Sequence, residues 1–289
     1  MKIKESELIL NPDGSVYHLN LKPEHISDTI LFVGDQDRVE KITKYFDSIE
    51  FSIQKREFKT QTGTYKGKRI TVISTGIGPD NIDIVINELD ALVNIDLNTR
   101  EIKPVHTCLT IIRVGTSGSL QEDIPVDSFV LSTHGLDLNG MMHSYQIDKI
   151  TNPILENEFI KSTNWSSQKA RPIIIENDKS LEEKMESELT YKGITATAGG
   201  FYGPQGRVLR LPLEDSNLND KMDTFSSNGH RISNLEMETS AIYGLSKLLG
   251  HRALSLNAII ANRVNGTFSN DPELVVDQLI KYTLEKLVE

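Results

Sequence analysis

Residues 29–46 read TILFVGDQDRVEKITKYF, and this stretch decides the fold class. Residues 29–33 form a short, mainly apolar run that is typical of a strand buried on both faces. Residues 34–37 follow as a turn, and apolar side chains then recur at helical spacing at Val39, Ile42, Tyr45 and Phe46. A buried strand followed directly by an amphipathic helix predicts an α/β fold.

The same alternation continues along the chain. Further strands are expected over residues 69–73, 109–112, 128–132, 193–198 and 253–261. Helical spacing of apolar residues marks residues 82–93, 180–191, 241–249 and 276–287. No linker divides this pattern, which favours one domain over residues 1–289. Residues 155–180 are interpreted as a polar, irregular surface excursion, and residues 212–233 as a loop.

Composition excludes several classes of protein. The chain of 289 residues has 31 Lys and Arg against 41 Asp and Glu, a formal charge of −10, which argues against general nucleic-acid binding. Cys108 is the single cysteine, so an intramolecular disulfide and a thiolate metal cluster are excluded. No apolar run reaches about 18 residues, and the first ten residues are too polar for a signal peptide. We therefore expect a cytoplasmic protein that contacts neither nucleic acid nor membrane.

Glycines gather where predicted strands end. The clusters are Gly76 and Gly78, Gly115 and Gly118, and Gly199, Gly200, Gly203 and Gly206. Ligands of open α/β sheets bind at the carboxyl ends of strands, and glycine there lets backbone N–H groups approach a ligand. Any one cluster is more simply an ordinary turn, but three of them favour a binding site.

Two arginines strengthen that interpretation. Arg38 begins the helix after the Gly34 turn, and Arg113 ends a buried apolar strand. A buried guanidinium needs a partner, which is either a structural carboxylate or a ligand anion. Because its planar fork suits phosphate, Arg38 and Arg113 with Gly34 and Thr116 form a candidate phosphate cradle. The spacing matches neither a P-loop nor a dinucleotide fingerprint.

Acidic and histidine residues complete the survey. Glu236, Met237 and Glu238 lie between a short apolar segment and a helix. Two carboxylates two residues apart on an extended segment share a face and could bind the diol of a ribose, or they could simply favour a helix start. The seven histidines show no metal-ligand spacing, so no metal site is expected.

Five motifs in order carry a resemblance to a known family. They are GDQDR (34–38), STGIG (74–78), RVGTSG (113–118), FYGPQGR (201–207) and EME (236–238). The chain resembles the hexameric nucleoside phosphorylases over nearly its whole length, and most closely their uridine-cleaving branch. The resemblance implies a single-domain, three-layer α/β/α fold with a mixed central β-sheet. It also implies that a nucleoside and orthophosphate react to give the free base and ribose 1-phosphate.

The resemblance assigns a role to each matching residue. The phosphate-site matches are Gly34, Arg38, Arg56, Arg113 and Thr116, with Arg56 reaching in from a neighbouring subunit. The nucleoside-site matches are His18, Phe201, Gln205, Arg207, Glu236, Met237 and Glu238. His18 would cross the same interface to the ribose 5′-hydroxyl, Phe201 would pack on the base, and Gln205 with Arg207 would read uracil. Arg113, Gln205, Arg207 and Glu236 would carry the catalysis.

The same resemblance sets expectations about the base and about partners. Purine-cleaving relatives carry an aspartate after a late strand, whereas here that strand continues as Asn262, Arg263 and Val264, which favours a pyrimidine. Departures remain, such as Pro204 directly before Gln205 and a glycine between the two base readers. A purine or broad-specificity phosphorylase and a catalytically silent nucleoside-binding protein stay as alternatives. A homo-oligomer with shared sites is expected, built from dimers into a hexamer. No cofactor is expected, except that Glu57 matches a position that helps hold a monovalent cation between subunits.

Overall fold

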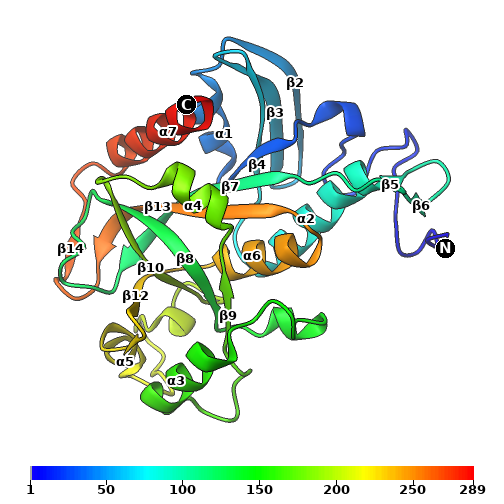
Figure 1. Ribbon diagram of the computed structural model, residues 1–289. Coiled ribbons are helices and arrows are strands. Elements are labelled where there is room, and N and C mark those ends of the chain that lie inside the picture. The colour runs from blue at the N-terminus through cyan, green and yellow to red at the C-terminus, as the bar shows by residue number, and fades with distance from the viewer. Residues whose placement is uncertain (1) are drawn as a thin grey trace.

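A twisted mixed sheet of twelve strands forms the centre of the protein, as a computed structural model of the chain shows (Figure 1). The structure describes residues 2–289. The strand order is β11-β12-β10-β8-β13-β7-β1-β4-β3-β2, with β14 paired to β13 and β9 to β8. The strands are β1 (Thr29–Val33), β2 (Ser48–Lys55), β3 (Phe58–Tyr65), β4 (Lys68–Ser74), β7 (Thr110–Ser119), β8 (Phe129–Asp137), β9 (Ile173–Glu176), β10 (Thr190–Thr197), β11 (Ser226–Ser227), β12 (His230–Glu236), β13 (Arg252–Asn262) and β14 (Thr267–Phe268). A separate two-stranded sheet joins β5 (Ile95–Asp96) to β6 (Glu101–Ile102).

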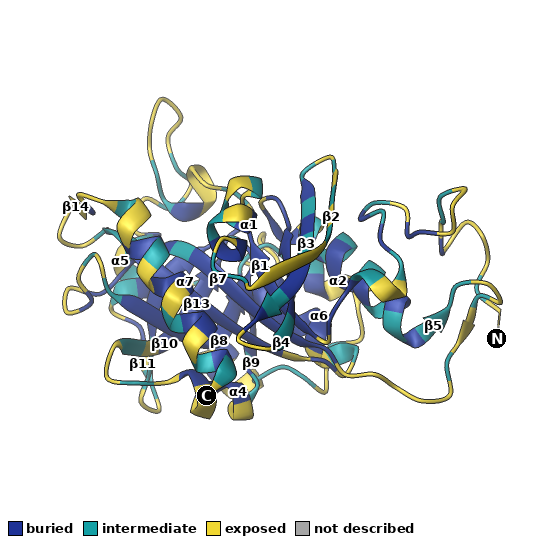
Figure 2. Cartoon of the chain, turned by 90° about the horizontal axis from the view of Figure 1, so that it is seen from above, coloured by how far each residue is buried: buried dark blue, intermediate teal, exposed yellow. Residues whose placement is uncertain are grey.

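Helices cover both faces of this sheet. On one face α2 (Pro79–Asn94) and α6 (Thr239–Leu248) pack against Ile30 and Phe32 of β1. On the other face α1 (Gln36–Thr43), α4 (Lys179–Met185) and α7 (Pro272–Val288) pack with Leu31 and Val33. Alternate side chains of a strand point to opposite faces, so residues 30–33 of β1 are apolar on both faces of the sheet. The three-layer α/β/α fold expected from the sequence is confirmed, and the buried strands lie between helices whose outer faces are exposed (Figure 2).

Part of the sheet closes on itself. Strand β7 pairs with β13 in parallel from Thr110 to Ser119, and its far end also pairs with β12 in antiparallel fashion through Ser119 and Asn234. Strands β13, β8, β10 and β12 complete the ring. The end of β7 therefore contacts strands on two sides, and residues that are distant in sequence meet around it.

Two stretches differ from the sequence-based expectation. Residues 155–180 are not irregular, because α3 (Pro153–Thr163) packs through Leu155 and Phe159, and β9 adds to the sheet. The stretch 212–233 contains α5 (Leu218–Asp223), β11 and the start of β12. The expected helix over residues 180–191 is shorter, because α4 ends at Met185. In each case a few buried side chains decide the structure within a mostly polar segment. Three short 3₁₀ helices, η1 (Pro23–His25), η2 (Met141–Ser144) and η3 (Gly203–Gln205), complete the fold.

Parallel strands bring the predicted motifs to one edge of the sheet. β1 pairs in parallel with both β4 and β7, so Gly34, Gly76 and Thr116 all lie at or beyond the same strand ends. Among residues 2–289, no helix has the length and apolarity needed to cross a membrane.

Candidate active site

A cavity of about 290 Å³ opens at this edge of the sheet. Ten of the twelve candidate site residues line it. They are Gly34, Arg38, Arg113, Thr116, Phe201, Gln205, Arg207, Glu236, Met237 and Glu238. These ten residues come from four separate segments of the chain, so the fold brings four of the sequence motifs together in one place.

One end of the cavity gathers positive charge at a helix start. Asp35 begins α1, and its side chain accepts a hydrogen bond of 2.7 Å from the Asp37 backbone N–H. This capping turn places Arg38 in the first turn of the helix, where its Nη1 lies 3.5 Å from the Val114 carbonyl oxygen. Burial and the neighbouring charge of Arg113 lower the pKa of Arg38. The two guanidinium groups repel one another, which favours an anion between them.

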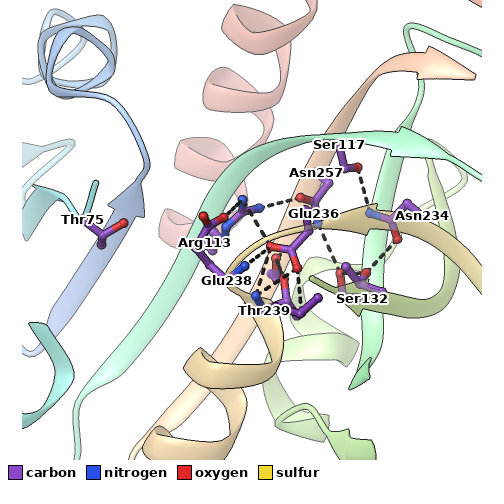
Figure 3. Close-up of polar contacts among 12 residues, drawn as sticks. Thr75, Arg113, Ser117, Ser132, Asn234, Glu236, Glu238, Thr239 and Asn257 are labelled. Atoms are coloured by element: carbon purple, nitrogen blue, oxygen red, sulfur yellow. Dashed lines mark hydrogen bonds and ion pairs between the residues drawn. The ribbon is translucent and has the colours of Figure 1, made fainter. Parts of the chain in front are cut away.

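The side chain of Arg113 is buried, and its guanidinium contacts two carboxylates and one amide. Its Nη2 donates to Glu238 Oε2 at 2.6 Å and lies 3.3 Å from Glu236 Oε2, while its Nη1 donates to Asn257 at 2.5 Å (Figure 3). Burial alone would lower the pKa of Arg113, but the carboxylates of Glu236 and Glu238 outweigh it and hold that pKa above its ordinary value. The buried guanidinium of Arg113 is therefore paired with two structural carboxylates, which is one of the two kinds of partner expected from the sequence. The same guanidinium also lines the cavity, where it can meet a ligand anion.

Glu236 and Glu238 both stabilise a helix start and line the cavity, the two roles that the sequence left open. Glu236 caps the start of α6, because its carboxylate accepts the backbone N–H groups of Glu238 (2.9 Å) and Thr239 (3.0 Å). Glu238 Oε1 accepts the Gly78 N–H at 2.8 Å, which ties this segment to the turn after β4. Both side chains line the cavity beside Arg113, so the helix start and the acidic wall of the site are one structure.

The opposite end of the cavity carries an amide and a guanidinium. Gln205 is 2% exposed at the end of η3, and Arg207 Nη1 donates to its Oε1 and, at 2.6 Å, to the Phe201 carbonyl. The Arg207 guanidinium lies 3.8 Å from the centre of the Phe201 ring. Burial and the nearby charge of Arg263 lower the pKa of Arg207 to about 10. Phe201 itself is 51% exposed, so it forms a wall at the mouth of the cavity.

Glu236 connects the two ends. Its carboxylate lies 3.3 Å from Arg113, and its backbone carbonyl accepts a hydrogen bond of 3.5 Å from Gln205 Nε2. A molecule that spanned the cavity would thus meet two guanidinium groups at one end and an amide with a third guanidinium at the other, with carboxylates between them.

Comparison with known proteins decides the family. The sequence profile described as the phosphorylase superfamily matches residues 28–286. The chain belongs to the phosphorylase superfamily.

Curated members of the superfamily align over almost the whole chain. A uridine phosphorylase of Thermococcus kodakarensis is 29% identical, covering 98% of this chain and 92% of its own length. A DeoD-type purine nucleoside phosphorylase of Listeria welshimeri is 26% identical, covering 94% of this chain and 99% of its own. Among solved structures, a Trypanosoma brucei nucleoside phosphorylase, described as showing uridine phosphorylase activity, superposes with a TM-score of 0.87 at 30% identity, covering 97% of this chain and 99% of its own.

Two of the expected superfamily site residues lie outside the cavity of the single chain. His18 is held by Glu88, whose Oε1 lies 2.6 Å from His18 Nδ1 and also accepts its backbone N–H. Arg56 is exposed in the turn between β2 and β3, with a left-handed backbone at φ +54°. Neither side chain is among the residues that line the cavity.

Eight lining residues were not among the twelve candidate site residues, although Gly118 belonged to one of the glycine clusters. They are Asp35, Ile77, Ser117, Gly118, Leu235, Ile260, Ala261 and Phe268. Four of them lie within the quoted motifs and Leu235 lies directly before one, so proximity to those motifs was a usable signal. Phe268 gave none, because it reaches the cavity only through the pairing of β14 with Ala261 of β13. Arg263 was noted only for the missing aspartate, yet its Nη1 donates to the Gln205 carbonyl at 3.1 Å.

One cluster of side chains has the composition of a metal site. Atoms of Asp90, His106 and His251 lie within 4.8 Å of one another. His251 Nδ1 accepts the Leu109 backbone N–H at 3.1 Å, so the proton of the neutral ring must sit on Nε2, which faces Asp90 at 3.2 Å. A protonated nitrogen cannot ligate a metal, and this cluster is better described as a histidine–carboxylate contact.

Proposed function

We propose that this chain is a phosphate-dependent pyrimidine nucleoside phosphorylase whose preferred substrate is uridine. The observation that carries the proposal is the convergence of Arg38, Arg113, Gln205 and Arg207 on one cavity. The names of the relatives support the same reaction, since uridine phosphorylases are among them at 28–29% identity. We propose one nucleoside phosphorylase domain over residues 1–289.

Orthophosphate is the nucleophile, so the protein need not supply one. Gly34, Arg38, Arg113 and Thr116 would hold phosphate against C1′ of the ribose, which converts a bimolecular encounter into an oriented one. A phosphate oxygen forms the new bond to C1′ while the C1′–N bond breaks and its electron pair leaves with the base. The transition state resembles an oxocarbenium ion, as in glycoside hydrolysis. Met237 would pack on the ribose, and the carboxylates of Glu236 and Glu238 would meet its hydroxyls and favour the positive charge.

The leaving base takes negative charge, which the far end of the cavity can stabilise. The Gln205 amide can pair with the amide edge of uracil, and Arg207 can donate to the oxygen on which charge develops. Phe201 would pack on the ring of the base. Catalysis is therefore assigned to Arg113, Gln205, Arg207 and Glu236.

A partner subunit would complete each site. Arg56 and His18 carry side chains suited to phosphate and to a ribose hydroxyl, yet both lie away from the cavity of their own chain. The two-residue loop of Arg56 and Glu57 joins β2 to β3, and the left-handed backbone of Arg56 is the ordinary geometry of such a hairpin turn. We propose a homo-oligomer built from dimers, and a hexamer as its full assembly. Orthophosphate is a co-substrate rather than a cofactor, and Glu57 would contribute to a monovalent-cation site between subunits.

A purine nucleoside phosphorylase is the second candidate, because DeoD-type purine enzymes are also among the relatives. Against it, β13 ends at Asn262 and is followed by Arg263 and Val264, which offer no carboxylic acid to protonate a purine. A silent nucleoside-binding protein is the third candidate, but such a protein would have no need of both Arg38 and Arg113 at a cavity.

The test is base release from uridine and from inosine, each with and without orthophosphate. We expect uracil release that requires phosphate and that is lost in Arg113→Ala. Phosphate-dependent release from inosine alone would overturn the pyrimidine assignment. Release without phosphate would indicate a hydrolase, and no release from either nucleoside would favour the binding protein.

A further inference from the structure

Asn257 lies deep in the ring of strands and contacts the guanidinium of Arg113. It is fully buried on β13, directly across from Gly115 of β7. Its Oδ1 accepts from Arg113 Nη1 at 2.5 Å. Arginine offers only donors, so the orientation of the Asn257 amide is determined: the oxygen faces Arg113 and the nitrogen faces away.

The nitrogen of that amide has two hydrogen-bond partners of its own. Asn257 Nδ2 donates to Ser132 Oγ and to Ser255 Oγ, both at 3.2 Å. Ser255 Oγ also accepts from Thr239 Oγ1 at 2.9 Å, and Ser132 Oγ shares a hydrogen bond with Thr195. Figure 3 shows Ser132 and Thr239 on either side of Asn257 in this network. Asn257 thus anchors Arg113 to a buried polar network that reaches the start of α6.

Asn257 accepts the hydrogen bond from Arg113 with a neutral amide rather than with a carboxylate. Arg113 already faces the carboxylates of Glu236 and Glu238, at 3.3 and 2.6 Å. A third carboxylate at position 257 would give the guanidinium three acidic neighbours and weaken its attraction for an anion. An amide accepts the same hydrogen bond without adding charge, so the net positive charge of Arg113 and Arg38 at the cavity is preserved.

We propose that Asn257 is a positioning residue for phosphate. It orients the guanidinium of Arg113 toward the cavity and, being neutral, leaves that guanidinium free to bind an anion. This inference rests on the proposed function for its kinetic consequence, but the effect on phosphate binding can be measured independently of turnover.

The decisive variant is Asn257→Asp, which keeps the size and the acceptor but adds a negative charge. We expect the KM for phosphate to rise about tenfold or more, because the added negative charge beside the guanidinium of Arg113 offsets its attraction for the anion, while the KM for uridine changes less than about twofold. Asn257→Ser is the second variant, because its shorter hydroxyl cannot reach Arg113 and adds no charge. It should raise the phosphate KM less than Asn257→Asp does.

Thr195→Val is the matched control. It removes a hydroxyl from the same buried network without touching the bond between Asn257 and Arg113. A purely structural role for Asn257 predicts that all three variants lower the melting temperature and kcat together, with no preferential change in phosphate KM, and that result would overturn the proposal.

Calorimetric titration of each variant with inorganic phosphate separates this inference from the proposed function. If the wild-type protein binds phosphate but does not release uracil, the proposed function fails and the Kd series still tests Asn257. If wild type is active and Asn257→Asp binds phosphate as tightly as wild type, the positioning role is wrong while the function stands.

Discussion

The guanidinium of Arg113 occupies the space that a side chain at position 115 would need. A Cβ placed on Gly115 would lie 1.8 Å from Arg113 Nη1 and 2.4 Å from its Cζ. The backbone of Gly115 is not left-handed, so its φ angle does not explain why this residue is glycine. The absence of a side chain explains it, because the guanidinium of Arg113 takes up that space. The small residue that follows Arg113 by two positions therefore lets the arginine fold back over its own strand.

Gly115→Ala should disturb phosphate use through that contact. The added methyl group must push Arg113 away from Glu238 or from the cavity, because the β7 backbone at this position is paired with Asn257 of β13. We expect kcat/KM for phosphate to fall about 100-fold, equivalent to a loss of about 3 kcal/mol of transition-state stabilisation. Steady-state kinetics at saturating uridine provide the measurement, with the melting temperature as the check on folding. An unchanged phosphate KM would show that Arg113 can be moved without consequence.

Gln205→Ala should mainly affect the base. The Gln205 amide is buried against the Glu236 carbonyl, and its removal also frees Arg207 from one of its two acceptors. We expect kcat/KM for uridine to fall about 100-fold, while the Kd of orthophosphate stays near the wild-type value. Parallel kinetics with uridine and calorimetry with phosphate measure the two effects. If the affinity for orthophosphate fell as much as kcat/KM for uridine, Gln205 would act on phosphate binding as well as on the base, contrary to this prediction.

Arg56→Ala and Arg113→Ala should complement one another if sites are shared between subunits. Each variant alone should be inactive. Co-expressed with different affinity tags, the mixed oligomer would contain sites in which the wild-type Arg113 of one chain meets the wild-type Arg56 of the other. Activity in doubly purified hybrids is the expected result. Inactive hybrids that still assemble would place both arginines in the site of a single chain.

The stability of the protein should fall in mild acid because of His134. This residue is buried on β8, and the centre of its ring lies 4.8 Å from the centre of the His230 ring in an edge-on arrangement. Burial is the main cause that lowers the pKa of His134 to about 4, and the charge of His230 is the second. The unfolded chain takes up the proton near pH 6.5 and the folded chain only near pH 4, so stability is lost as the pH falls between those values. The loss from this group is about 3 kcal/mol.

Urea unfolding at pH 7, 5.5 and 4 measures that loss. His134→Gln should flatten the decline in the free energy of unfolding, because an amide takes up no proton in this range. His143→Gln is a control of the same kind, since His143 is exposed. A decline as steep in His134→Gln as in the wild-type protein would assign the acid sensitivity to other groups.

Local pattern was enough for much of the fold and for part of the candidate site, whereas Phe201, Gln205 and Arg207 were selected only through the family resemblance. The apolar run at residues 29–33 became β1 with the expected bounds, because a strand buried on both faces has little choice of composition. Arg113 was identifiable because a charge directly after an apolar strand needs a partner. The stretch around residues 155–180 was misread, since the helix there buries one narrow stripe of side chains and the strand is four residues long.

The sequence by itself determined the α/β class, the order of the elements and the residue types at the strand ends. Tertiary structure alone decided that Arg113 would meet Glu238 and Asn257, which lie 125 and 144 positions further along the chain. It also decided that His18 and Arg56 would stay outside the cavity of their own chain. The physical reason is that helices and buried strands follow from the periodicity of neighbouring residues, whereas the partner of a buried charge depends on which distant strands pair around it.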